Sequence, residues 1–545
     1  MMRKTSNLFS LLTTSLFILT LSCNSHQHPG KKIFRYNEAT GIASLDPAFA
    51  KNQSIMWPVH QLYNTLVEVD EKMNIKPSLA SHWNFSADRK QILFFLRNDV
   101  FFHDDPAFAN GKGRQLKASD VAYSFNRIID PNTASPGAWI FNSRVDSLQP
   151  FVAINDSVFQ LNLAKPFQPI LGILSMQYCS IVPAEAVEKY GKDFRRHPVG
   201  TGPFAFTAWD EGQALILKKN NRYFEKDSSG YPLPYLDGIH VSFYDSKATE
   251  FLEFRQERLD FINDIDASFK DEVLTKTGHL KKQWEGKLIL QKHPYLNIEY
   301  LGVLADSSNP IVQASPLKWL KIRQAISYGI DRKKMMLYLR NSIGTAAENG
   351  FVPPGLPSFD AALVKGFTYD PEKAKRLISE AGYHASNPMP VIKLLTIPNY
   401  AALGSYIVNE LKQLGINAVV ETVQKSLLLE QTAKSQALFF RGSWIADYPD
   451  AENYLSVFYG KNPAPPNYTR YKNPVFDELY EQSLQEQNDS LRYVLYRKMD
   501  NLILQDVPVI PLWYDMVLHL VHPYVKEFSC NSLNMLELRR VKKDH

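Results

Sequence analysis

The sequence predicts a mixed α/β fold, because segments with strand character alternate along the chain with segments of helical periodicity. The chain has 545 residues, enough for several domains or for one large two-lobed body. Its composition, with 45% hydrophobic and 21% charged residues, is typical of globular proteins. No internal repeat or low-complexity tract is present, so we expect α/β structure throughout.

A buried strand and a helix are predicted in the first third of the chain. Residues 92–96 form an apolar run bounded by charges, which is typical of a buried strand. Residues 120–129 have helical periodicity, and Asp130-Pro131 ends the pattern. The apolar face of this helix consists of Val121, Phe125, Ile128 and Ile129.

Three further helices and a strand are predicted in the second half. The first helix begins at Ser315-Pro316, where a capping side chain precedes a proline of the first turn. The second has Asp370 as its N-cap and ends at Gly382, and the third spans residues 404–414 before a strand at 418–423. The predicted inner face of the first helix consists of Trp319, Ile322, Ile326, Gly329 and Ile330.

The N-terminus has the features of a secretory signal peptide at residues 1–22. Arg3-Lys4 precedes a mostly apolar run at residues 8–21, which is short for a membrane-spanning helix. Cys23 follows as in a bacterial lipobox, although Thr20 replaces the usual large aliphatic residue. We therefore predict lipidation of Cys23 and a polar lipid-anchor linker at residues 23–30. The alternative is cleavage nearby that leaves an unmodified cysteine.

Several functional classes are disfavoured by the sequence. The formal net charge is +5 with acids and bases interspersed, so the sequence lacks the clustered basic residues that are typical of nucleic-acid-binding proteins. No metalloprotease, hydrolase or Walker motif is present, and residues 200–205 match a dinucleotide fingerprint without its strand-turn-helix context. We expect no catalytic residues, no cofactor and no metal site. Cys179 and Cys530 either pair or remain separate buried thiols, and we favour separate thiols.

Segments along nearly the whole mature chain resemble the oligopeptide/dipeptide-type solute-binding proteins of ABC importers. The most specific segment is Pro198-Val199-Gly200-Thr201-Gly202-Pro203-Phe204, which is similar to the family signature. In chain order the other segments are 45–47, 63–67, 77–80, 83, 96–104, 120–125, 209, 221–224, 323–331, 370–374, 381–383, 444–450 and 507–512. Asp105 departs from the usual glycine, and residues 106–115 are longer than is usual in the family.

The resemblance implies a two-lobed, periplasmic-binding-protein-like α/β fold with mixed sheets, a hinge between the lobes and an additional small domain. The implied limits are residues 31–63, 198–295 and 512–545 for lobe I, 64–197 for the small domain packed on it, and 296–511 for lobe II. The two chain crossings near residues 296 and 511 are expected to act as the hinge, so that the lobes close over a ligand.

The resemblance also implies where a peptide binds. A receptor for many peptides binds the shared backbone and charged ends, and the segment Arg441-Gly442-Ser443-Trp444-Ile445-Ala446-Asp447 follows a predicted buried strand at 438–440. In the family, the acid three residues after the tryptophan pairs with the peptide ammonium; this acid is Asp447 here. Arg441 resembles the arginine near the ligand carboxylate.

Other interpretations of these residues stay open. A turn before Pro449 is the alternative role of Asp447, and a surface ion pair is that of Arg441. The expected binding residues are therefore Asp447, Trp444, Arg441 and Ser443, with Asn52 of Lys51-Asn52-Gln53 at the opposite edge of the cleft.

The function implied by the resemblance is an extracytoplasmic, lipid-anchored and monomeric receptor. It captures peptides in the cleft between the lobes and delivers them to an ABC permease in the membrane. The alternatives are a receptor for a non-peptide solute, such as a nickel chelate, haem or an oligosaccharide, a cell-surface hydrolase, and a solute sensor that partners a signalling protein.

Overall fold

The structure is a computed structural model that describes residues 30–544, apart from residue 266. The predicted signal peptide, Cys23 and the linker up to residue 29 lie outside the described residues. Within the described part, no helix is both long enough and apolar enough to cross a membrane.

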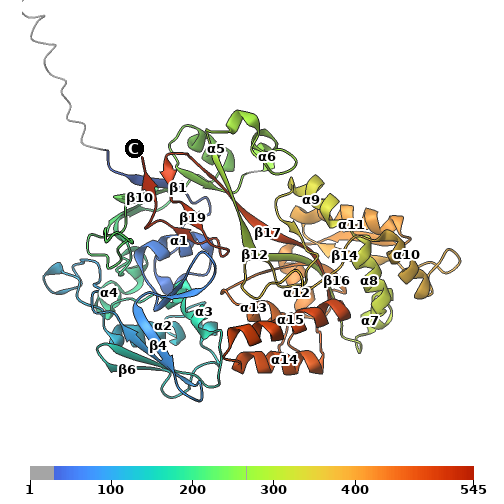
Figure 1. Cartoon of the computed structure of the whole chain (residues 1–545), viewed down its shortest axis with the longest axis horizontal. Helices are drawn as coiled ribbons and strands as arrows, with labels where there is room; N and C mark the ends of the chain where they lie inside the picture. Colours follow the sequence, from blue (N-terminus) through green and yellow to red (C-terminus); the bar gives the residue numbers. More distant parts are fainter. Residues whose placement is uncertain (1–29, 266, 545) are drawn as a thin grey trace, which may run out of the picture.

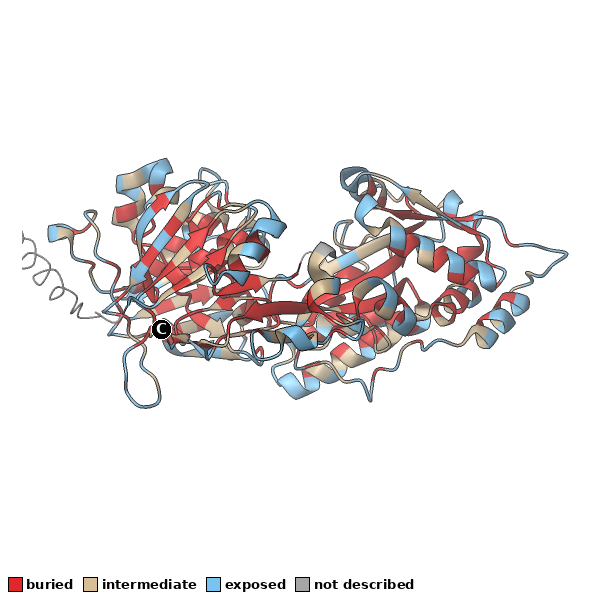
Figure 2. Ribbon diagram, turned by 90° about the horizontal axis from the view of Figure 1, so that it is seen from above, coloured by how far each residue is buried: buried red, intermediate tan, exposed pale blue. Residues whose placement is uncertain are grey.

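Two α/β bodies are joined by a pair of long neighbouring strands (Figure 2). The strands are β12 (Ile289–Val303) and β17 (Val509–Val521), which pair in antiparallel register from Ile289↔Val521 to Gly302↔Val509 with two irregularities. At one end of the strand pair, the side chain of Val521 belongs to the hydrophobic core of the first body. At the other end, Val303 and Ile510 belong to a hydrophobic core of the second body. The predicted crossings near residues 296 and 511 lie inside these two strands. We call the first body lobe I and the second lobe II.

Lobe I contains a four-stranded sheet in which the first strand of the chain lies beside a much later one. Its order is β1-β10-β9-β8, with β1 parallel to β10 and the other pairs antiparallel. The C-terminus returns to this sheet, as Figure 1 shows, and the buried Lys543 ammonium lies 2.9 Å from the Asp260 carboxylate. The elements of this part are β1 (Ile33–Asn37), α1 (Gln53–Leu62), β8 (Phe204–Asp210), β9 (Ala214–Lys219), β10 (Gly238–Ser242), α5 (Lys247–Arg255), β11 (Phe261–Asn263), α6 (Ala267–Val273), β18 (Val525–Lys526), β19 (Ser529–Cys530), β20 (Leu536–Glu537) and β21 (Lys542–Lys543).

A second four-stranded sheet, β4-β5-β7-β6, packs on lobe I and shares its hydrophobic core. In β5 the side chains of Ile92, Phe94 and Leu96 are buried on one face. The elements around this sheet are β2 (Val67–Val69), β3 (Ile75–Pro77), β4 (Ala80–Phe85), β5 (Gln91–Leu96), α2 (Ala118–Ile129), β6 (Phe151–Asn155), β7 (Val158–Asn162), α3 (Ile170–Leu174) and α4 (Ala184–Tyr190). We call this part the small domain; its predicted limits, residues 64–197, stay a prediction.

Lobe II is built on most of a seven-stranded sheet of order β11-β17-β12-β16-β14-β15, with β13 paired to β17; the edge strand β11 belongs to lobe I. Helices cover it on both sides, and α14 and α15 lie against the small domain (Figure 1). Besides β12 and β17, the elements are α7 (Pro310–Gln313), α8 (Leu320–Gly329), α9 (Arg332–Arg340), β13 (Thr345–Ala346), α10 (Pro371–Glu380), β14 (Ile392–Thr396), α11 (Ala401–Gln413), β15 (Ala418–Thr422), α12 (Lys425–Ala433), β16 (Phe439–Ile445), α13 (Glu452–Leu455), α14 (Pro474–Gln485) and α15 (Asp489–Asp506).

Most predicted elements are confirmed, with shifted ends. The strand at 92–96 and the helices at 120–129, 370–382 and 404–414 correspond to β5, α2, α10 and α11. The Asp370 side chain caps α10 by accepting from the Lys373 amide at 2.9 Å, and Gly382 has a left-handed φ of 88° just after the helix.

The predicted helix that begins at Ser315-Pro316 is wrong in its first turn. Ser315 caps a separate 3-10 turn at Pro316–Lys318, and α8 begins only at Leu320. Trp319 therefore lies between the two elements and is 51% exposed instead of facing the core. Ile322 and Ile326 are buried as expected.

Candidate functional site

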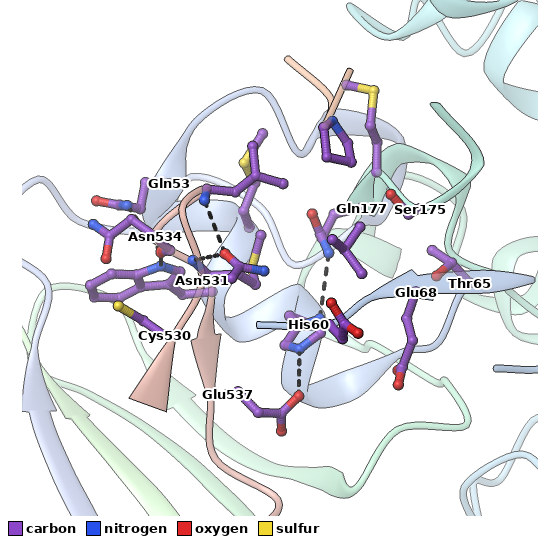
Figure 3. A pocket seen from close by; sticks show the side chains of 18 of the residues that line it. Gln53, His60, Thr65, Glu68, Ser175, Gln177, Cys530, Asn531, Asn534 and Glu537 are labelled. Carbon is purple, nitrogen blue, oxygen red and sulfur yellow. Dashed lines mark hydrogen bonds and ion pairs between the residues drawn. The ribbon is translucent and has the colours of Figure 1, made fainter. Parts of the chain in front are cut away.

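A cavity of about 970 Å³ lies where lobe I, the small domain and lobe II meet. Lobe I lines it with residues from α1 and the C-terminal segment, and the small domain with the β2–β3 hairpin and the region of Ser175–Tyr178. Lobe II contributes the end of β16 and the residues after it, and Tyr295 of β12 also lines the cavity. Figure 3 shows part of this lining around His60. A volume of this size is in the range of small-molecule and cofactor sites.

Asp447 is a predicted site residue that does line the cavity. It lies just beyond the end of β16, and its side chain is accessible to solvent on the cavity side. Protein surrounds it closely enough that burial raises the pKa of this carboxyl group, opposed by the Asn453 hydrogen bond and the charge of Arg144. In the described part of the chain no basic side chain forms a salt bridge with it within 4.0 Å. Among these residues Asp447 thus presents a carboxylate without an ion-pair partner.

The Asn453 side chain fixes the position of Asp447. Its Oδ1 accepts from the Asp447 amide at 3.3 Å and from Trp444 Nε1 at 3.0 Å, and its Nδ2 donates to Asp447 Oδ2 at 3.2 Å. Asn453 is itself buried in α13. The side-chain amide of Asn453 therefore holds both Trp444 and Asp447 in place, although Trp444 itself does not line the cavity.

Two buried polar clusters brace the chain after Asp447. The Glu452 carboxylate accepts hydrogen bonds from the hydroxyls of Tyr448 and Tyr480, and burial raises its pKa. The Asp450 carboxylate accepts from the Tyr496 hydroxyl at 2.7 Å and is ion-paired with Arg492. Buried groups with satisfied hydrogen bonds hold a segment rigidly. The cavity-lining loop is thus anchored to α14 and α15.

Arg441 and Ser443, which we expected at the ligand, do not line the cavity. The Arg441 guanidinium is ion-paired with the buried Glu299 of β12 and lies 3.6 Å from the centroid of the Tyr400 ring. Burial raises the pKa of Glu299, and the charge of Arg441 opposes that rise. Contacts of Arg441, Ser443 and Trp444 with a ligand stay predictions, and the structure brings only Asp447 and Asn52 of the expected residues to the cavity.

Asn52 lies on the opposite wall, where it caps α1. Its Oδ1 accepts from the Ile55 amide at 3.3 Å and from the Ser54 hydroxyl at 3.1 Å. The cap explains why α1 begins at Gln53 and why Asn52 is placed at the cavity edge. Its carbonyl oxygen is thus occupied in the helix cap.

Lobe I contributes a charged wall that the sequence did not predict. His60 Nε2 lies 3.3 Å from the Glu537 carboxylate, and its Nδ1 lies 3.4 Å from Gln177 Nε2, as Figure 3 shows. Burial alone would raise the pKa of Glu537, but Arg539 and His60 lower it to about 2. Arg539 is also paired with Glu68 at 2.9 Å. These charges are matched within the protein.

The two cysteines of the described chain are free and buried, which confirms the favoured interpretation of separate thiols. Cys530 lines the cavity, whereas Cys179 does not. Burial raises the pKa of both thiols, so neither is a reactive thiolate at neutral pH. Among residues 30–544 apart from the undescribed position, no three His, Cys, Asp or Glu side chains are arranged to hold a metal ion.

Comparison with known proteins finds similarity along most of the chain. The family model of bacterial extracellular solute-binding proteins, family 5 Middle, matches residues 74–466. The chain is 27% identical to heme-binding protein A of Haemophilus influenzae, covering 86% of this chain and 84% of that protein. It is 24% identical to the periplasmic oligopeptide-binding protein OppA of Salmonella typhimurium, covering 90% and 89%.

A solved structure has the same overall fold. The structure of HbpA2 from Haemophilus parasuis superposes with a TM-score of 0.82 at 23% identity, over 94% of this chain and 100% of that one. The two-lobed α/β fold class is thereby confirmed.

Proposed function

Because the chain belongs to family 5 of the bacterial extracellular solute-binding proteins, we propose that it is the receptor of an ABC importer for peptides. The peptide occupies the cavity between the lobes, and the loaded receptor delivers it to a permease in the membrane. The observation that carries this proposal is Asp447, an ionisable carboxylate that lines the cavity and, among the described residues, forms no salt bridge.

The chemistry of Asp447 suits a peptide ammonium. Every unmodified peptide has an α-ammonium that is protonated below a pH of about 8. A carboxylate whose ionised form is poorly solvated gains from a cation that enters the closed cavity with the ligand. The His60–Glu537 and Arg539–Glu68 pairs are matched within the protein, whereas among the described residues Asp447 forms no salt bridge.

Relatives support the same ligand class. The Salmonella typhimurium relative is named for oligopeptides, and a Pseudomonas aeruginosa relative, 24% identical, is named a di/tripeptide-binding protein. The Haemophilus influenzae relative is named for haem, which keeps a non-peptide solute as the second candidate. The family is one of binding proteins, so hydrolysis of the ligand is not part of the proposed function.

The family is described as extracellular, and the signal peptide predicted at residues 1–22 agrees with this location. We propose further that Cys23 is lipidated and that residues 23–30 tether a monomeric receptor to the membrane surface, close to its permease. Intact-mass measurement of the membrane-extracted protein, compared with its Cys23→Ser variant, tests the lipid.

The ligand class is tested first by mass spectrometry of what denatured protein releases after purification from cells. Families of small peptides support the proposal, and a single non-peptide solute overturns it. Calorimetry then compares the Asp447→Ala variant with wild type for one such peptide. The expected loss of affinity is about 30-fold to a few thousandfold, because removing one partner of a desolvated ion pair costs about 2–5 kcal/mol. Asp210→Ala, which removes an exposed carboxylate of β8 outside the cavity, serves as the matched control.

A further inference from the structure

The walls of the cavity differ in charge. Apart from Asp447, every charged residue of the lining lies within residues 51–76 or 537–540. The part contributed by residues 136–180 of the small domain carries no charged side chain. It consists of Trp139, Tyr178, Met176, Pro136 and three small or amide side chains. We call this part the aromatic wall.

The aromatic wall adjoins the Asp447 loop. A Cβ placed on Gly172 of α3 would lie 3.5 Å from Cδ of Pro449, so α3 packs on the chain two residues after Asp447. Met176 and Tyr178 follow α3 directly, and the charge of Asp447 contributes, after burial, to raising the pKa of Tyr178 to about 12. The loop and the wall are therefore neighbours.

Trp139 lies on the same side. The Arg144 guanidinium donates to the Trp139 carbonyl oxygen at 2.8 Å and lies 5.8 Å from the centroid of its ring. Arg144 is also the cation whose charge reaches Asp447. Trp139 is 37% exposed although it is a large aromatic residue, and its exposed part lines the cavity.

The covalent structure of a peptide connects these two features. The ammonium nitrogen of a peptide is bonded to the first Cα at about 1.46 Å, and the first side chain is attached to that same Cα. The first side chain therefore begins one bond away from the ammonium that Asp447 is proposed to bind. On the proposed function, the first side chain must lie against a surface next to Asp447. We propose that Trp139, Met176 and Tyr178 form the pocket for that side chain and select peptides whose first residue is apolar or aromatic.

The selection follows from what the pocket offers. An apolar or aromatic side chain leaves water and packs against aromatic rings, which favours binding. A polar side chain gains less, and an acidic one lies beside the negative charge of Asp447, against a wall whose cavity-lining residues carry no charge. The order of affinity is therefore an aromatic or apolar first residue, then serine, then aspartate.

Calorimetry with the four tripeptides Phe-Ala-Ala, Leu-Ala-Ala, Ser-Ala-Ala and Asp-Ala-Ala tests this selection on the purified protein. We expect the first two to bind roughly 10- to 100-fold more tightly than Ser-Ala-Ala, and Asp-Ala-Ala to bind least. The Trp139→Ala variant is expected to lose most of the preference for Phe-Ala-Ala over Ser-Ala-Ala. Trp319→Ala is the matched control, because Trp319 is 51% exposed and lies outside the cavity.

The outcomes separate this inference from the proposed function. If all four peptides bind equally, the aromatic wall is not selective and the inference fails while the peptide function stands. If Phe-Ala-Ala is preferred and Trp139→Ala, with an unchanged melting temperature, keeps that preference, the assignment of the pocket is overturned. If no peptide binds, the proposed function fails, and the inference that rests on it fails too.

Discussion

Arg441 and Asp447 stand at the two ends of one short segment, and their surroundings are opposite. Arg441 lies within β16 and is paired with the buried carboxylate of Glu299. Asp447 lies in the loop beyond the strand and, in the described chain, forms no salt bridge, although the charge of Arg144 acts on its carboxylate. The same sequence pattern therefore supplies one charge that the protein neutralises itself and one that it leaves for a ligand. Whether a charged side chain is available to a ligand therefore depends on whether the protein supplies an ion-pair partner for it, and the sequence motif alone does not determine this.

The largest effect expected from this comparison is on stability, at Arg441. Arg441→Ala leaves the Glu299 carboxylate buried without its cation, which typically costs about 3–5 kcal/mol of unfolding free energy. Urea unfolding of the ligand-free protein measures this loss. The double variant Arg441→Met with Glu299→Gln removes both charges and is expected to recover most of it. If Arg441→Ala is as stable as wild type but binds peptide more weakly, the structural role of Arg441 is contradicted. The predicted contact between Arg441 and the carboxylate of the ligand is then favoured.

A smaller effect is expected at Asn453. Asn453→Leu keeps the size of the side chain but removes the three hydrogen bonds to Trp444 and Asp447. We expect peptide affinity to fall by about 1–3 kcal/mol, because the Asp447 carboxylate loses its orientation. Calorimetry with a free and an N-acetylated peptide measures the effect, since only the free peptide has the ammonium.

The matched control for this variant is Asn467→Leu, which removes another buried amide of lobe II that hydrogen-bonds the Tyr459 and Tyr471 carbonyls. It is expected to lower the melting temperature without changing the ratio of the two affinities. If Asn453→Leu also leaves that ratio unchanged, Asn453 has a structural role only.

The smallest expected effect is on the pH dependence of stability, because keeping Asp447 ionised in the folded protein costs free energy. Burial raises its pKa in the folded state above the ordinary value of 3.8. Between 3.8 and the raised pKa the folded state holds the proton more tightly, so stability falls as the pH rises through this window. Asp447→Asn removes that dependence, and its melting temperature at neutral pH is expected to equal or slightly exceed the wild-type value. Thermal melts of both proteins from pH 3.5 to 7 test this, and a clear drop for Asp447→Asn would contradict it.

Local signals in the sequence predicted elements well where one residue type determines the end of an element. Asp370 and Gly382 delimit α10 because a side-chain cap and a left-handed glycine act over a few residues. The same reasoning failed at Ser315, where the cap serves a short 3-10 turn and α8 begins after Trp319. A capping signal indicates that a turn begins there, but not how far the helix continues.

The candidate site was only partly predictable. Asp447 and Asn52 were expected and line the cavity. The pairing of His60 with Glu537 joins residues that are far apart in the chain, and no local pattern indicates it. The partner of Arg441 is likewise set by the register of β12 against β16, which brings Glu299 and Arg441 to neighbouring strands. Such pairs depend on tertiary contacts that a single sequence does not display.

The position of β17 in the chain has a consequence for how the protein is made. This strand pairs with β11, β12 and β13 in the large sheet, yet it ends at Val521, near the end of the chain. β11 and β12 therefore lack the strand that lies between them until residues 509–521 have been synthesised, and the pairing of β17 with β12 closes a loop of more than two hundred residues. Contacts so distant in sequence form slowly. A truncation before Val509 would thus remove the strand that pairs with β11, β12 and β13.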